Sequence, residues 1–290
     1  MKSVFISRLA STIVLWTVAL WAVFKGHELT FFALISAIGL RGLWEFFKML
    51  DHKGLPNFKG TAMVCGAVLI AGSFHYYRTV GPAQSYDWEF MSLLGFLLTV
   101  FTRQMFKGLR EVSPLPTMAY TIFGLLYVTW LFNFVTKIVY ALPRSPDLHV
   151  TGQFYVLYLV VVTKFSDMGA YLTGSLIGKH PLVPHISPKK TWEGFFGALV
   201  ISTLGSYAMF GIMPEHLSRL NWLHATILGL LLGFAAIIGD LAESIIKRGT
   251  DVKDSGRLLP GIGGALDLID SLLFTAPLLF FYLRVVIGVA

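Results

Sequence analysis

The chain has 290 residues, of which 55% are hydrophobic and only 13% are charged, and its formal net charge at pH 7 is +7. Soluble domains carry about 25% charged residues, so this composition excludes an ordinary solvated surface. The basic residues are spread over the breaks between apolar runs, which is typical of membrane topology signals and argues against a nucleic-acid partner. The single cysteine, Cys65, excludes an intrachain disulfide and a cysteine metal cluster.

Apolar runs bounded by polar breaks divide the sequence. They fall near 5–24, 31–49, 61–76, 90–106, 117–136, 154–173, 195–213, 223–239 and 271–289. A spanning helix needs roughly 17–25 such residues, so the third and fourth runs are marginal. We predict an all-α, polytopic integral membrane protein with about nine transmembrane helices. The first run carries Trp16 and Trp21 and has no small-x-small cleavage site before Lys25, so we interpret it as a retained anchor.

The positive charges are distributed unequally over alternate loops. Nine spans would place fifteen lysines and arginines on one side of the membrane and six on the other. The positive-inside rule then predicts a multi-pass cell-membrane protein with a cytoplasmic N-terminus. The loops 174–194 and 240–270 are both expected in the cytoplasm, where nucleotides are found.

The two halves of the sequence differ in information content. Residues 1–150 are mostly generic spans with short loops, and we interpret them as an N-terminal transmembrane region. Glu45, in "LRGLWEFFKML", is interpreted as an interfacial or packing residue. Residues 151–290 carry the unusual polar segments and are predicted to be a C-terminal transmembrane catalytic region with cytoplasmic site loops.

The segment "KFSDMGAYLTGSLIGKHPLVPHISPKKTWEG" begins inside an apolar run. Asp167 is costly there, and Lys164 one turn away is a candidate partner, so the pair is either structural or part of a site. Gly169, Gly174 and Gly178 permit close backbone approach, and their commonest use in membranes is helix packing.

The end of the same segment, "SPKKTWEG", predicts an anion site. Pro188 breaks the chain, and the Thr-x-Glu sequence that starts at Thr191 can cap the next helix. Lys189 and Lys190 stand immediately before that helix start, where backbone amides also attract anions. Taken alone, the two lysines are better interpreted as topology charges, and it is the acidic cluster expected on the same membrane face that favours the anion site.

The stretch 239–270 concentrates six of the sixteen acidic residues of the chain, mixed with four basic ones. Asp240, Glu243 and Lys247 share one helix face, and Asp267 and Asp270 are also one turn apart. Carboxylates at two helix ends with a glycine-rich loop between them suit Mg²⁺, which prefers oxygen ligands and leaves room for substrate phosphates. A solvated loop with compensating charges is the alternative.

These residues together resemble the signature of phosphatidate cytidylyltransferases, also called CDP-diacylglycerol synthases. That pattern reads Ser-x-x-Lys-Arg, four residues, Lys-Asp, then Pro-Gly-His-Gly-Gly, two residues, and Asp-Arg-x-Asp. The chain meets it with Ser244, Lys247, Arg248, Lys253, Asp254, Pro260, Gly261, Gly263, Gly264, Asp267 and Asp270. Two positions depart from it, because Ile262 replaces the histidine and Leu268 replaces the arginine.

The resemblance implies transfer of the cytidylyl group of CTP to phosphatidate, giving CDP-diacylglycerol and pyrophosphate in phospholipid biosynthesis. Mg²⁺ is the implied cofactor, with metal ligands expected among Asp240, Asp254, Asp267 and Asp270. The residues expected to be catalytic are Lys190, Lys247, Arg248, Lys253, Asp254 and Asp267. Those expected to bind substrate are Ser187, Lys189, Lys190, Thr191, Arg257, Gly263 and Gly264.

Arg257 is either a replacement for the cation missing at positions 262 and 268, through its guanidinium, or an exposed loop arginine that serves as a topology charge. The expected partners are CTP, phosphatidic acid and membrane lipid, and a homodimer is an assembly that the sequence allows. Two alternatives stay open. One is a related CTP-dependent lipid-phosphate enzyme, such as a polyprenol kinase or another lipid cytidylyltransferase. The other is a polytopic transporter, although transporters usually show paired repeats and a midplane site.

Overall fold

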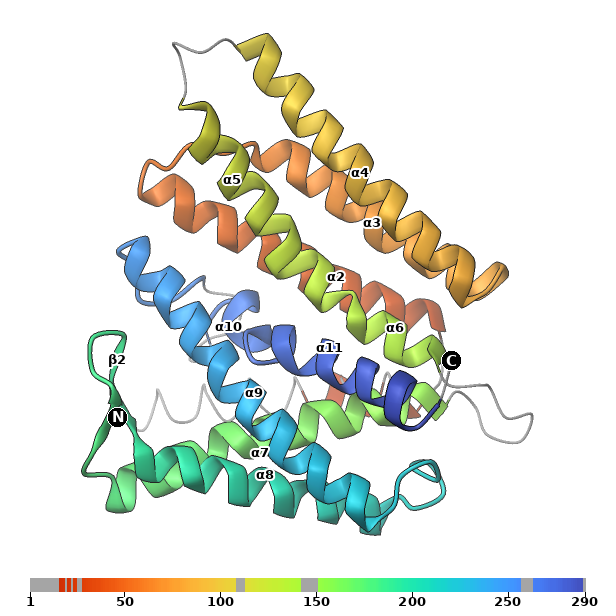
Figure 1. The fold of residues 1–290 in the computed structure, drawn as a ribbon, viewed down its shortest axis with the longest axis vertical. Helices are drawn as coiled ribbons and strands as arrows, with labels where there is room; N and C mark the ends of the chain where they lie inside the picture. Colours follow the sequence, from red (N-terminus) through yellow and green to blue (C-terminus); the bar gives the residue numbers. More distant parts are fainter. Residues whose placement is uncertain are drawn as a thin grey trace. The chain divides into compact units, whose positions relative to one another are not determined.

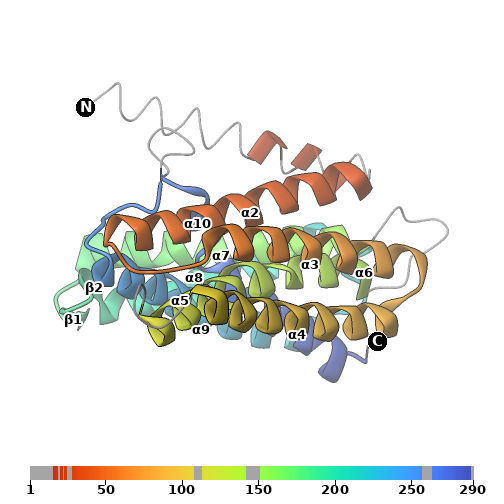
Figure 2. The same cartoon turned by 90° about the horizontal axis from the view of Figure 1, so that it is seen from above.

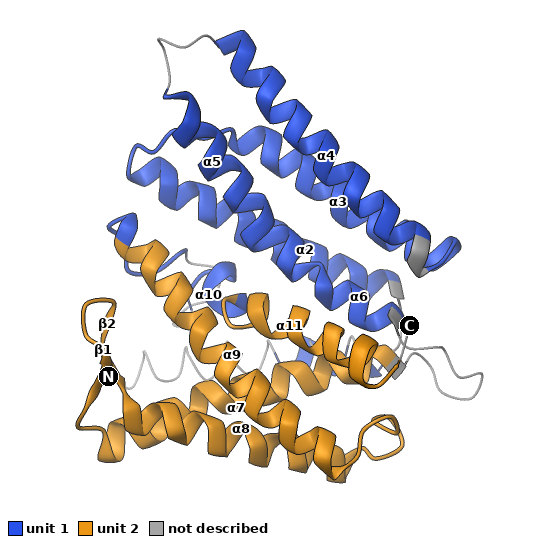
Figure 3. Cartoon of the chain, in the orientation of Figure 1, with its two compact units in different colours: residues 1–140, 249–269 blue, residues 141–248, 270–290 orange. Residues whose placement is uncertain are grey.

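The structure, a computed structural model, describes residues 16–18, 20–21, 23–24, 28–107, 113–141, 151–256 and 263–288. The chain forms two compact units, coloured separately in Figure 3. Unit 1 comprises residues 1–140 and 249–269, and unit 2 comprises residues 141–248 and 270–290. The division into an N-terminal region, 1–150, and a C-terminal catalytic region, 151–290, stays a prediction from the sequence. The chain crosses from unit 1 to unit 2 between Ile269 and Asp270, so the two aspartates of the signature, Asp267 and Asp270, belong to different units.

Unit 1 is built on long helices that the apolar runs predicted. Its elements are α2 (Glu28–His52), α3 (Lys59–Thr79), α4 (Pro82–Lys107), α5 (Pro114–Gly124), the π-helical η1 (Leu125–Trp130), α6 (Phe134–Ala141) and the short α10 (Ala265–Ile269). Helices α3 and α4 lie side by side as a hairpin in Figures 1 and 2. Gly81 makes their turn at a φ of +129°, a conformation that favours glycine.

The helices of unit 1 pack closely around apolar and small side chains. Leu43 and Phe47 of α2 are fully buried together with Leu125. A Cβ on Gly72 would lie 1.9 Å from the indole nitrogen of Trp88, so glycine is what lets this tryptophan of α4 reach the backbone of α3.

Unit 2 carries the polar segments of the second half of the chain. Its elements are α7 (Thr151–Ile177), β1 (Pro181–Val183), β2 (Ser187–Thr191), α8 (Trp192–Ile212), α9 (Trp222–Gly249), α11 (Leu272–Phe281) and the π-helical η2 (Tyr282–Val286). Strands β1 and β2 pair antiparallel, with Pro181 opposite Thr191 and Val183 opposite Ser187. Loop 174–194 therefore contains a hairpin, which the all-α prediction did not include.

Small residues and hydroxyl groups join the helices of unit 2. The Ser166 hydroxyl donates to the carbonyl oxygen of Gly233 at 3.1 Å, and that of Ser202 donates to Gly229 at 2.8 Å. A Cβ on Gly169 would lie 2.6 Å from the carbonyl oxygen of Gly197, which confirms that this glycine serves helix packing. These contacts suit a membrane interior, where apolar side chains gain little by leaving lipid.

Within the described residues, six helical segments are long and apolar enough to cross a membrane. They are Leu29–His52, Pro114–Tyr140, Gly152–Ile177, Trp192–Ile212, Trp222–Gly249 and Ala265–Val286. The protein is thus an all-α, multi-pass membrane protein in its spanning part, and the predicted count of about nine is not confirmed. Helices α3 and α4, which are not among the six, correspond to the two runs predicted to be marginal. The first run, 5–24, lies largely outside the described residues.

Candidate active site

A pocket of about 240 Å³ lies in unit 2, where the β hairpin meets α7, α8 and α9. Its polar wall is formed by Asp167, Lys189, Lys190, Thr191, Gly194 and Asp240. Tyr171, Leu182 and Phe195 contribute an apolar wall. The pocket therefore offers both signs of charge, a helix start and an apolar surface within one small volume.

The start of helix α8 forms because Thr191 caps it. The backbone of Thr191 is extended, and the Oγ1 of its side chain accepts a hydrogen bond from the backbone N–H of Gly194 at 3.1 Å. Glu193 stands in the first turn, where a negative charge suits the helix dipole. The predicted cap is confirmed, and it fixes Lys189 and Lys190 immediately before the amides of a helix N-terminus.

Two glycines allow the end of α7 to approach the cap. A Cβ on Gly178 would lie 2.2 Å from the carbonyl oxygen of Gly174 and 2.8 Å from Oγ1 of Thr191. A Cβ on Gly194 would lie 2.9 Å from the carbonyl oxygen of Ala170. Larger residues at 178 or 194 would push the hairpin and α8 away from α7, so these glycines shape the pocket.

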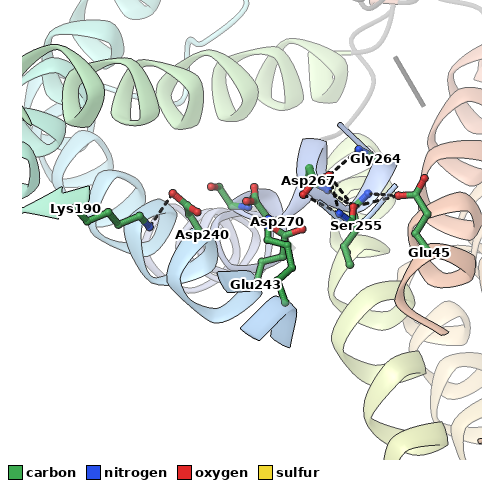
Figure 4. Close-up of polar contacts among 11 residues, drawn as sticks. Glu45, Lys190, Asp240, Glu243, Ser255, Gly264, Asp267 and Asp270 are labelled. Carbon is green, nitrogen blue, oxygen red and sulfur yellow. Dashed lines mark hydrogen bonds and ion pairs between the residues drawn. The ribbon is translucent and has the colours of Figure 1, made fainter. Parts of the chain in front are cut away.

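Two lysine–aspartate pairs place charge at the pocket. Figure 4 shows the ion pair of Lys190 with Asp240, in which Nζ lies 2.7 Å from Oδ2. The Nζ of Lys164 lies 2.9 Å from Oδ2 of Asp167. Asp240 and Asp167 also act electrostatically on Asp270, which is buried and accepts a hydrogen bond from the backbone N–H of Ser271 at 2.5 Å. The two ion pairs and Asp270 together bring three carboxylates and two lysines into this part of unit 2.

Helix α9 divides the remaining predicted charges of unit 2 among different partners. Glu243 is fully buried and pairs with Lys247 one turn later, whereas Asp240 pairs with Lys190 of the hairpin. Arg248 donates from Nε to the carbonyl oxygen of Ile186 at 3.4 Å, so the end of α9 lies against the hairpin. Within unit 2, the hairpin and the end of α9 are therefore in contact through Lys190 and Asp240 and through Ile186 and Arg248.

A separate polar cluster in unit 1, which we call the Glu45 cluster, consists of Glu45, Ser255, Gly264 and Asp267 (Figure 4). The Asp267 carboxylate accepts from the Ser255 hydroxyl at 2.8 Å and from the Gly264 N–H at 2.6 Å. The buried Glu45 carboxylate accepts from the Leu266 N–H at 3.0 Å. Each hydrogen bond to a carboxylate is worth about 1.5–3 kcal/mol, so the cluster fixes the start of α10 on α2.

Two glycines of the signature are required by the Glu45 cluster. Gly263 has a φ of +111°, and a Cβ there would lie 2.6 Å from Oδ2 of Asp267. A Cβ on Gly264 would lie 2.3 Å from Oε2 of Glu45. Their glycine identity is explained by this packing.

The predicted site residues thus fall into groups. Lys189, Lys190, Thr191 and Asp240 line the pocket of unit 2, and Ser187 begins strand β2. Gly263, Gly264 and Asp267 belong to the Glu45 cluster, while Lys253 and Asp254 line a second pocket, in unit 1. Leu268 lies in α10, and Arg257 and Ile262 lie outside the described residues.

The structure adds contacts for two ionisable residues whose roles the sequence did not settle, Glu45 and Asp167. Glu45 is predicted to be an interfacial or packing residue, and the structure buries it where it accepts hydrogen bonds from residues more than 200 positions away. Asp167 was left open between a structural pair and a site, and it both pairs with Lys164 and lines the pocket. The available signal was the same for both, namely an ionisable residue inside an apolar run.

The donor set of unit 2 fits Mg²⁺ without forming a complete cage. Among the residues that the structure describes, no group of three or more histidine, cysteine, aspartate or glutamate side chains is arranged to hold a metal ion. Mg²⁺ is commonly bound through one or two carboxylates together with substrate phosphates and water. Asp167 and Asp240 on the pocket wall meet that requirement.

Comparison with known proteins gives a consistent result over most of the chain. The profile of the cytidylyltransferase family matches residues 6–286. The Bacillus subtilis (strain 168) phosphatidate cytidylyltransferase is 33% identical over 258 residues, which cover 88% of this chain and 89% of the relative. The Staphylococcus aureus (strain COL) phosphatidate cytidylyltransferase is 34% identical, with the same coverage of both chains. The Escherichia coli (strain K12) protein YnbB is 38% identical, over 88% of this chain and 78% of the relative.

Proposed function

We propose that this chain, which belongs to the cytidylyltransferase family, transfers the cytidylyl group of CTP to phosphatidate, giving CDP-diacylglycerol and pyrophosphate. The observation that carries the proposal is that relatives named phosphatidate cytidylyltransferase match 88% of the chain. The pocket of unit 2 supports it, because paired lysines at a helix start suit phosphate groups and aspartates suit the accompanying cation.

The proposed reaction requires little covalent chemistry from the protein, because the bonds form and break between the two substrates. A phosphate oxygen of phosphatidate forms a bond to the α-phosphorus of CTP, and the bond from that phosphorus to the bridging oxygen breaks. Pyrophosphate leaves with the electron pair. A phosphate monoester has a second pKa of about 6 and is already anionic near neutral pH, so no general base is required. Positioning and charge stabilisation are the tasks that remain.

The pocket residues have distinct parts in this proposal. Lys189 and Lys190 bind phosphate oxygens of CTP, and the amides at the start of α8 add further donors. Lys190 must then exchange Asp240 for phosphate, which frees the Asp240 carboxylate. Asp240 and Asp167 would hold Mg²⁺, and Asp270 as a metal ligand stays a prediction. The bound ion would supply charge neutralisation at the phosphates. Asp254 and Asp267 as metal ligands, Lys247, Arg248 and Lys253 as catalytic groups, and a homodimer stay predictions.

An assay with radiolabelled CTP distinguishes this function from its alternatives, because each reaction transfers a different phosphorus atom to the lipid. Purified protein is incubated with phosphatidate and with CTP labelled on either the α- or the γ-phosphorus. Cytidylyl transfer places the α label in the lipid and releases the γ label as pyrophosphate. With polyprenol as the acceptor, a CTP-dependent polyprenol kinase would place the γ label in the lipid and leave the α label in CDP, and a transporter labels no lipid. Replacing phosphatidate by polyprenol phosphate tests the acceptor, and equal product from both acceptors would contradict a phosphatidate enzyme.

We further propose that the hairpin of unit 2 faces the cytoplasm, as the charge distribution predicts. Lys179 is exposed at the edge of the hairpin. In a Cys65→Ser background, Lys179→Cys should resist an impermeant maleimide in intact cells and react after lysis. Labelling in intact cells would overturn this orientation and the access of cytoplasmic CTP to the pocket.

A further inference from the structure

A second pocket, entirely within unit 1, joins the signature residues Lys253 and Asp254 to basic residues of α2 that lie outside the signature. Its volume is about 600 Å³, and it is lined by the last part of α2 and by residues 251–256. The side chains that α2 contributes are Arg41, Lys48, Met49 and His52. We call it the α2 pocket.

The basic residues of the α2 pocket share one helix face. Arg41, Lys48 and His52 are separated by seven and four positions, so they follow one another along α2. The Trp44 ring lies beneath two of them, with the Arg41 guanidinium carbon 4.3 Å and the Lys48 Nζ 5.0 Å from its centroid. Cation–π attraction of about 0.5–1 kcal/mol each at exposed sites favours these positions.

Hydrogen bonding orients Arg41 without using up its donors. Its Nε donates to Oε1 of the buried Glu45 at 3.1 Å. An arginine side chain has five N–H donors on three nitrogens, so the two terminal nitrogens can still meet a ligand. Through Ser255, the Glu45 cluster also fixes the opposite wall of the pocket, which ends at Gly256.

The charge left on the wall is mainly positive. Glu45 is matched by Arg41, and Asp251 is matched by Lys53, which is not a lining residue. The charged side chains that then line the pocket are Lys48 and Lys253 beside a single further acid, Asp254, and the imidazole of His52 adds a polar group. Flexible lysines that converge with an arginine fork are the usual protein ligands of phosphate.

We propose that the α2 pocket is an anion subsite that takes a phosphate group of one of the two substrates. The identity of that substrate rests on the proposed function, whereas the binding of a phosphate anion does not. The chemistry is shared by two sources, the headgroup of the lipid phosphate and the polyphosphate of the nucleotide. The pocket is larger than one phosphate requires, so it can also admit the atoms that carry it.

The test compares the full-length variants Lys48→Ala and His52→Ala with Lys59→Ala. Lys59 lies over the same Trp44 ring, 4.8 Å from its centroid, but does not line the pocket. It therefore controls for loss of a positive charge at this corner of unit 1. Calorimetric titration in detergent measures binding of inorganic pyrophosphate and of a short-chain phosphatidate, and the lipid-product assay gives KM for CTP and for phosphatidate.

We expect Lys48→Ala to weaken binding of one probe by about tenfold and to raise the KM of the matching substrate similarly, with kcat little changed. His52→Ala should act on the same probe, and Lys59→Ala should resemble wild type. An effect on pyrophosphate and CTP assigns the nucleotide, and an effect on phosphatidate assigns the lipid. Variants that match Lys59→Ala with both probes, or a fall in kcat alone, would overturn the subsite. Wild-type protein that makes no CDP-diacylglycerol but still shows the Lys48 effect would overturn only the proposed function.

Discussion

The pocket of unit 2 and the Glu45 cluster of unit 1 use the same kind of side chain in different ways. In the Glu45 cluster, the carboxylates of Glu45 and Asp267 accept hydrogen bonds from backbone N–H groups and a hydroxyl. In the pocket of unit 2, Asp240 and Asp167 instead face lysines. A carboxylate that satisfies buried backbone donors cannot leave them cheaply, whereas a partly exposed ion pair costs little to exchange.

This difference suggests which acidic residues of the chain hold its fold and which are free to meet a ligand. Glu45 has a side chain with 0% exposure, whereas the side chain of Asp240 is 40% exposed. Solvent access lets Lys190 and Asp240 separate when phosphate and a cation arrive. The comparison therefore predicts that substitutions in the pocket of unit 2 lower turnover and that substitutions in the Glu45 cluster lower stability.

The largest effect is expected for Asp240→Asn. The substitution keeps the shape of the side chain but removes the charge that pairs with Lys190 and that would meet Mg²⁺. We expect kcat/KM to fall at least a hundredfold, about 2.7 kcal/mol, with the midpoint of thermal unfolding nearly unchanged. Lipid-product kinetics and a melting curve measure the two quantities. Turnover within about threefold of wild type would remove Asp240 from the site.

Glu45→Gln should mainly lower stability. The amide keeps one acceptor oxygen, but it loses the charge that pairs with Arg41 and turns a donor toward the Leu266 N–H or the Ser255 hydroxyl. We expect unfolding free energy to fall by about 2 kcal/mol, measured by denaturant titration of tryptophan fluorescence. Glu89→Gln is a matched control, because it removes the charge of another buried ion pair of unit 1, with Lys137, outside the Glu45 cluster. If only the control is destabilised, Glu45 does not fix α10.

Asp267→Asn distinguishes a structural role of this signature carboxylate from a role as a metal ligand. Its carboxylate receives the Ser255 hydroxyl and the Gly264 N–H, and asparagine can still accept with one oxygen. We expect a loss of about 1.5 kcal/mol in unfolding free energy and at most a tenfold fall in turnover per folded molecule. Abolished turnover at unchanged stability would instead assign Asp267 to the metal, as the sequence pattern predicted.

The smallest effect is expected for Thr191→Ala. The variant loses the cap of α8, in which Oγ1 accepts the Gly194 N–H at 3.1 Å. Loss of such a cap costs about 1 kcal/mol, and Thr191→Ser should restore it. Thermal unfolding of the three proteins checks this. Equal stability of the alanine and serine variants would show that the hairpin holds the start of α8 without the cap.

The sequence predicted the helices of both units because apolar runs report burial in lipid wherever the chain is long enough. It also predicted the cap at Thr191, since a helix cap depends on local residues. It could not pair Lys190 with Asp240, which lie fifty positions apart, because pairing depends on how α9 meets the hairpin.

The hairpin and the Glu45 cluster were missed for different physical reasons. The segment contains prolines at 181, 184 and 188, and proline disfavours strands because it lacks a backbone N–H donor. The strands are recognised only from the pairing of Val183 with Ser187 in the folded chain. Among the described residues, Glu45 accepts locally from Arg41, and its other donors are Ser255 and Leu266, more than 200 positions later in the chain. A charge inside a span was the clue, but only folding shows what satisfies it.

Protection of the pocket of unit 2 by nucleotide tests the central claim most directly. Because Cys65 is the single cysteine, a Cys65→Ser background allows Leu182→Cys on the pocket wall and Lys179→Cys on the exposed edge to be labelled separately. The account predicts that CTP with Mg²⁺ slows maleimide labelling at 182 by at least about tenfold and leaves labelling at 179 unchanged. Equal labelling rates at 182 with and without CTP, at concentrations that saturate turnover, would contradict it.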